Sequence, residues 1–65
     1  MGPMSLEKLF DLLGTRDIPG TPDELKLLAV RIRELVELNG EQWVRKNSQR
    51  LLSEWAYALH LGRKA

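Results

Sequence analysis

Turn-forming residues divide this chain into three segments, each of which carries apolar side chains at the spacing of a helix. Gly14, the Pro19-Gly20 pair and Gly40 separate the segments, and glycine and proline are the residues that most often end helices or form turns. Within each segment, apolar positions recur three and four residues apart, as on the buried face of a helix. The sequence therefore predicts an all-α fold, a small three-helix bundle. The predicted helices span residues 5–13, 22–39 and 41–61.

The first two predicted helices have clear start signals. Ser5 is a good N-cap for the first helix, which is too short to persist alone. Thr21, Pro22 and Glu24 form the pattern of a capping box, with proline at the first helical position and glutamate at the third. In the connector between the two helices, Ile18 is pushed toward extended geometry by the proline that follows it. We expect Ile18 to fill space between the helices; an exposed Ile18 is the alternative.

The second and third helices carry the longest apolar stripes. The predicted buried face of the second helix consists of Leu25, Leu28, Ala29, Ile32, Leu35 and Val36. The predicted buried face of the third consists of Val44, Leu51, Leu52, Trp55, Ala58 and Leu59. Asn47 and Ser48 interrupt the latter face near its start, and we expect them at the solvated end of the bundle. Two or three residues connect the helices, so they form either an antiparallel hairpin, which their long stripes favour, or a sharp bend like that of a helix-turn-helix.

Length and composition indicate one small domain held together by apolar burial. The chain has 65 residues, 43% of them hydrophobic, and no cysteine that could form a disulfide or a thiolate metal site. We assign residues 4–65 to this domain and interpret residues 1–3 as a cloning remnant. There is no apolar run long enough to span a membrane, and the start lacks the apolar core of a signal peptide. We therefore expect a cytoplasmic protein that does not enter a membrane.

The sequence offers little support for catalysis. Its one histidine, His60, has neither a cysteine nor an adjacent carboxylate with which to form a nucleophile–base pair, and it falls on the polar face of the third helix. The acidic residues do not follow the spacing of a calcium loop or of a carboxylate–histidine site, and the glycines do not form a phosphate loop. We predict no enzyme activity, no catalytic or metal site, no cofactor and no small-molecule substrate.

Three cations early in the third helix support an alternative function. Arg45, Lys46 and Arg50 are interleaved with polar residues of the kinds that contact phosphates and base edges, as on the recognition helix of a helix-turn-helix. Against this alternative, the formal net charge is only +1, and Lys46 stands where the motif requires an apolar residue. A small DNA- or RNA-binding domain is therefore less favoured than a solvated basic face.

A second stripe on the third helix supports the function that we favour. Trp43, Arg50, Tyr57 and Leu61 project within about 40° of one another, well away from the centre of the core stripe. Tryptophan, tyrosine and arginine are enriched in binding hot spots. A comparable row on the second helix consists of Leu27, Arg31 and Leu38. If both rows face outward, they form an apolar patch larger than a soluble monomer usually exposes. The alternative is that the first helix packs on one of the rows and covers it. We therefore predict a non-enzymatic protein–protein interaction module, either a homodimer or an adaptor that docks on another protein.

Overall fold

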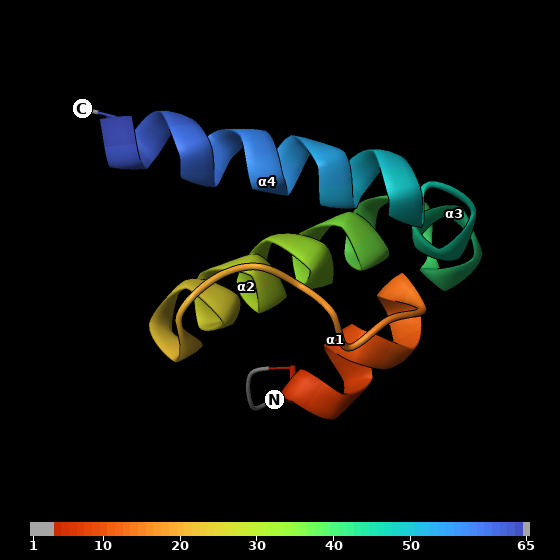
Figure 1. The fold of residues 1–65 in the computed structure, drawn as a ribbon. Helices are drawn as coiled ribbons and strands as arrows, with labels where there is room; N and C mark the ends of the chain where they lie inside the picture. The colour runs from red at the N-terminus through yellow and green to blue at the C-terminus, as the bar shows by residue number, and fades with distance from the viewer. Residues whose placement is uncertain (1–3, 65) are drawn as a thin grey trace.

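The computed structural model describes residues 4–64 and folds that range into four helices without a strand. In chain order, the helices are α1 (Leu6–Leu13), α2 (Pro22–Asn39), α3 (Glu41–Lys46) and α4 (Ser48–Lys64) (Figure 1). The predicted all-α bundle is confirmed, whereas the supposed cloning remnant lies outside the described residues. Within residues 4–64, no helix combines the length and the apolarity needed to cross a membrane.

The predicted start and stop signals of the first two helices are confirmed. The Ser5 hydroxyl accepts a hydrogen bond from the backbone N–H of Lys8, and Gly14 ends α1 at φ 74°, a left-handed conformation that favours glycine. At the start of α2, the Thr21 side chain accepts the N–H of Glu24 while the Glu24 carboxylate accepts the N–H of Thr21 at 2.8 Å. Both helices therefore begin where their local hydrogen-bonding groups are satisfied.

The prediction of one long third helix over residues 41–61 is wrong, because Asn47 divides this segment into α3 and α4. The side-chain amide of Asn47 donates to the carbonyl of Trp43 at 2.8 Å, and its backbone N–H points to the carbonyls of both Trp43 and Val44. Asparagine competes with helical hydrogen bonding in this way. The Asn47 carbonyl then accepts the N–H of Leu51 at 3.0 Å, so the residue that ends α3 also precedes the first turn of α4. In addition, α4 continues three residues beyond the predicted end.

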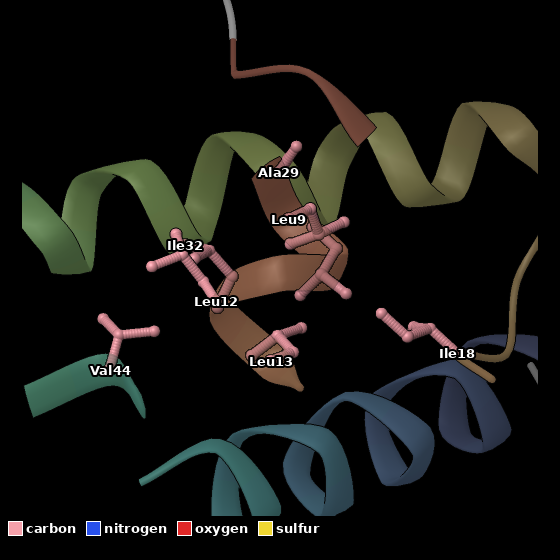
Figure 2. Packing of buried hydrophobic residues seen from close by; sticks show 8 residues of the cluster. Leu9, Leu12, Leu13, Ile18, Ala29, Ile32 and Val44 are labelled. Atoms are coloured by element: carbon pink, nitrogen blue, oxygen red, sulfur yellow. The ribbon is translucent and has the colours of Figure 1, made fainter. Parts of the chain in front are cut away.

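The hydrophobic core lies among α1, the connector that follows it, α2 and α3. Its eight buried residues are Leu9, Leu12, Leu13, Ile18, Leu28, Ala29, Ile32 and Val44 (Figure 2). Ile18, only 8% exposed, fills the core from the connector as predicted. None of the described side chains of α4 is buried to the same extent. This seventeen-residue helix therefore lies against the core and does not form its centre.

Half-buried side chains and two polar contacts attach α4 to the rest of the molecule. Leu51, Leu52 and Trp55 pack on the edge of the core. The indole N–H of Trp55 donates to the carbonyl of Pro19 in the connector at 2.8 Å. Near the other end of α4, Arg63 donates to the Glu24 carboxylate at 3.0 Å, and the pKa of Glu24 is lowered mainly by its hydrogen bond with the backbone of Thr21. The connector and the start of α2 thus hold α4 in place.

The two long helices are spread apart by the short α3 that stands between them. Figure 1 shows α4 running back over α2 in the opposite direction after the turn made by α3. Of the helix pairs in the described range, α2 and α4 nevertheless have the least close backbone approach, whereas α2 packs closely on α3 and on α1. The sequence predicts that the two long helices are joined directly as a hairpin, but in the structure α3 lies between them in the chain. The space between α2 and α4 therefore stays open on one side.

Candidate functional site

An open groove of about 350 Å³ lies between α2 and α4. Its lining comes from α2, α3 and α4. The lining residues are Leu28, Arg31, Leu35, Trp43, Arg50, Leu51, Glu54, Trp55 and Ala58. Six of these nine side chains are apolar, so water in the groove is in contact with a mainly hydrophobic surface. The volume is at the small end of the range of about 300–1,000 Å³ that is typical of ligand pockets.

The groove exists because each long helix carries a wider apolar face than the core can cover. On α2, Leu28 is 3% exposed and belongs to the core, while Leu35 is only half-buried. On α4, Leu51 and Trp55 pack on the core with one part of the side chain and line the groove with another. Closer packing of α2 on α4 would bury these surfaces, but α3 holds the two helices apart.

Trp43 and Arg50 form one wall of the groove. The guanidinium carbon of Arg50 lies 5.7 Å from the centre of the half-buried Trp43 ring, within the range of a cation–π contact. The same guanidinium lies 3.9 Å from the carboxylate of Glu54, one turn further along α4. Both partners of this ion pair are 60% exposed, so solvent screens their attraction. Arg50 therefore remains accessible to a further carboxylate.

The structure brings only some of the predicted partner-binding residues into one site. Trp43, Arg50 and Arg31 line the groove. The others do not belong to its lining, and their exposed fractions are 64% for Tyr57, 49% for Leu61, 68% for Leu27 and 79% for Leu38. The alternative that the first helix covers one of the two rows has no support in the groove, since no residue of α1 belongs to its lining.

Sequence reasoning missed most of the apolar lining. Leu28, Leu35, Leu51 and Trp55 were expected to be core residues, and all of them do contact the core. Ala58 was expected to be buried as well, but it is exposed. The sequence contains no direct signal that these side chains also face a groove, because their spacing is that of any buried stripe. The signal that could have indicated it is Asn47, whose side chain ends α3 and so decides where α4 lies relative to α2.

Comparisons with known proteins leave the geometry as the basis for assigning a function. No protein-family model matches the chain, and neither curated proteins nor solved structures show significant similarity to it.

The cations proposed for nucleic-acid binding do not form one free basic surface. Arg45 donates to the Asp11 carboxylate at 2.9 Å and to the Asp11 backbone carbonyl at 3.1 Å, and it lies 3.6 Å from Glu41. Lys8 also contacts Glu41, at 3.2 Å. These contacts connect α1 to α3 across a mixed-charge surface. Of the three predicted cations, Arg45 is paired with acidic groups and Arg50 lies against Trp43. Within residues 4–64, only Lys46 of these three is exposed without an ion pair or a ring contact, so the geometry does not favour phosphate binding.

Within residues 4–64, no three histidine, cysteine or acidic side chains are close enough to hold a metal ion. His60 is an exposed residue of α4.

The contact between Asp11 and Arg45 predicts a pH effect on stability. The hydrogen bond from Arg45, followed by its positive charge, holds the pKa of Asp11 below its ordinary value. Because the pKa is lower in the folded state, this contact stabilises the protein above the unfolded-state pKa, near pH 4. The stabilisation is lost as the pH falls through the folded-state pKa. Asp11→Asn is therefore expected to flatten the acid side of the stability curve, measured by urea denaturation from about pH 6 to pH 2.

Arg45→Gln is the matched control for this effect. It leaves Asp11 in place but removes the cation that lowers its pKa, so it should flatten the curve in the same way, and the double variant should add little. An acid slope that stays at the wild-type value in both single variants would contradict the contact.

Proposed function

We propose that this chain is a non-enzymatic helical protein–protein interaction module that docks a helical segment of a partner in the groove between α2 and α4. The observation that supports the proposal is the groove itself, which combines an apolar lining with the paired Trp43 and Arg50 side chains. Helix-in-groove recognition uses this arrangement, in which apolar anchors of an amphipathic helix enter a groove between two helices.

The size and charge of the groove define the partner that fits it best. A volume of about 350 Å³ holds a few anchoring side chains and no complete helix, so the backbone of the partner would lie on the rims. Two arginines and one glutamate line the groove, which leaves an excess of positive charge. A partner helix with apolar anchors and a carboxylate beside them is complementary to both features. Tryptophan and arginine are also the residue types most enriched in binding hot spots.

Photo-crosslinking tests the groove with a matched pair of positions on α4. Ala58 and Ala56 are both exposed, but only Ala58 lines the groove. We expect a photoreactive amino acid at position 58, introduced in the host cells of the protein, to give a discrete covalent product after irradiation. The same amino acid at position 56 should give none. The mass of the product distinguishes another protein from a second copy of this chain.

A groove variant completes this experiment. Adding Trp43→Ala to the protein that carries the crosslinker at position 58 should greatly reduce the yield, because it removes the ring that supports Arg50. Circular dichroism checks that this variant is still folded. The proposal is wrong if positions 56 and 58 give the same products, or if position 58 gives none.

A further inference from the structure

The outer face of α2 carries a short row of four exposed residues with a regular spacing. The row consists of Leu27, Arg31, Glu34 and Leu38, separated by four, three and four positions. This spacing is that of the a and d positions in a coiled coil, which form one seam along a helix. The seam is about 16 Å long at the rise of an α-helix. Leu27 and Leu38, at its ends, are 68% and 79% exposed and are the most exposed of the large hydrophobic residues in the described range.

The row is complementary to itself when its direction is reversed. Read from either end, it has a leucine, a charge four positions later, the opposite charge three positions after that, and a leucine. A two-fold axis through the middle of the row therefore places Leu27 opposite Leu38 and Arg31 opposite Glu34, twice. A two-fold interface requires this kind of self-complementarity, in which each residue meets a different one on the partner. Antiparallel coiled coils pair their a positions with d positions in the same way.

From this pattern we propose that α2 is a homodimerisation helix, which pairs antiparallel with α2 of a second copy of the chain through Leu27, Arg31, Glu34 and Leu38. This proposal goes beyond the groove: of the four residues of the row, only Arg31 also belongs to the groove lining. A parallel arrangement in register would place Arg31 against Arg31 and Glu34 against Glu34, which is electrostatically unfavourable. The occupant of this face is therefore a second copy in reversed orientation.

The charges within one protomer support the proposal. Arg33 with Glu37, Arg45 with Glu41 and Arg50 with Glu54 all form ion pairs one helical turn apart. Arg31 and Glu34 are three positions apart, a spacing that also permits contact, yet the described part of the chain shows neither in an ion pair. Both are exposed, so each is available to a group from outside the protomer.

The buried face of α2 is occupied and leaves the row uncovered. Leu28, Ala29 and Ile32 form that face and belong to the core with α1 and α3. Beside the row, Val30 is 51% exposed and Leu35 is half-buried, and together they widen the apolar margin of the seam. Burying exposed leucine and valine against a second copy supplies the favourable free energy, and the two Arg31–Glu34 pairs define the orientation.

Charge reversal tests the pairing by sedimentation equilibrium over a concentration series. We expect the wild-type protein to show a monomer–dimer equilibrium. Arg31→Glu and Glu34→Arg should each weaken it at least about tenfold, because each places like charges opposite one another twice. A 1:1 mixture of the two variants should recover the association, because the two α2 helices then carry opposite charges at every facing position. All substituted residues are exposed, and circular dichroism verifies that the variants are folded.

Three outcomes would overturn the proposal. The first is a wild-type protein that remains monomeric at millimolar concentration. The second is a pair of single variants that dimerise as tightly as the wild type. The third is a 1:1 mixture of the two variants that stays monomeric. The first excludes self-association, the second places it elsewhere on the surface, and the third removes the proposed Arg31–Glu34 contacts. The crosslink at position 58 reports on the groove separately, so the failure of one proposal is distinguishable from the failure of the other.

The absence of cysteine from the chain allows a direct test of orientation. We expect oxidation of a mixture of Leu27→Cys and Leu38→Cys proteins to give mainly the mixed disulfide, because these positions face each other across the proposed axis. In the same arrangement, two copies of position 27 would be about 16 Å apart, too far for a disulfide. A product dominated by disulfides between identical variants would contradict the antiparallel arrangement.

Discussion

Replacing Leu12 by alanine is expected to remove a large part of the stability of the protein. Leu12 is 1% exposed and belongs to the same buried cluster as Ile32 and Val44. Truncating a fully buried leucine costs about 2–5 kcal/mol, through lost apolar burial and the cavity that remains. A domain of this size has a total unfolding free energy of roughly 3–10 kcal/mol. The loss is therefore a large fraction of the whole, and urea denaturation followed by circular dichroism measures it.

Leu38→Ala is the control for this prediction. The same side chain is removed from the same type of helix, but Leu38 is 79% exposed, so the cost should be within about 0.5 kcal/mol. Both variants are compared with the wild type at low micromolar concentration, where the proposed dimer contributes little. Similar losses of stability at the two positions would contradict the core described above.

Replacing Trp55 by alanine is expected to have the second largest effect, by releasing α4 from the core. No described side chain of α4 is fully buried, so its attachment depends on half-buried residues, and Trp55 is the largest of them. Its ring packs on the core cluster and its indole N–H donates to the Pro19 carbonyl. Because the ring is only half-buried, we expect a cost of about 2–4 kcal/mol, somewhat below that of a fully buried tryptophan. Denaturation gives the total, and hydrogen exchange should show the amides of α4 losing protection before those of α2.

Two further variants separate the contributions of Trp55. Trp55→Phe keeps a ring but removes the indole donor, so it should cost about 1 kcal/mol for the hydrogen bond to Pro19, plus a small packing loss. Trp43→Ala removes a half-buried ring whose main polar neighbour is the exposed Arg50, and it should cost less than Trp55→Ala. Equal losses at positions 43 and 55 would show that Trp43 is a structural residue and would weaken the case for the groove.

The helix boundaries that could be predicted are those that depend only on residues close to the boundary in the sequence. Ser5, Gly14 and the Thr21–Glu24 capping box act over one turn of chain, and the structure has all of them in the predicted roles. The wrong boundary is at Asn47. Its effect depends on whether the amide side chain bonds to the Trp43 carbonyl or to water, and the identity of the residue does not decide between them.

The candidate site was only partly predictable, because helical spacing gives the side of a helix on which a residue lies but not the distance to the next helix. Trp43, Arg50 and Arg31 were recognised because they lie off the core stripes, and all three line the groove. Leu51 and Trp55 were assigned to the core because spacing shows which side of a helix is apolar, but not how far away the neighbouring helix is. Tyr57 and Leu61 were grouped with Trp43 on one continuous helix, but they lie on α4 beyond Arg50 and are outside the groove lining.

The sequence by itself thus determined the all-α class, the caps of the first two helices and the apolar stripes, because each of these depends on the geometry of a single helix. Only the tertiary structure decided that α4 lies apart from α2, with the apolar surface between them open to solvent. The physical reason is that burial depends on the distance between two packed elements. Here one hydrogen-bonded asparagine ends α3 and separates it from α4, and this break leaves α4 apart from α2.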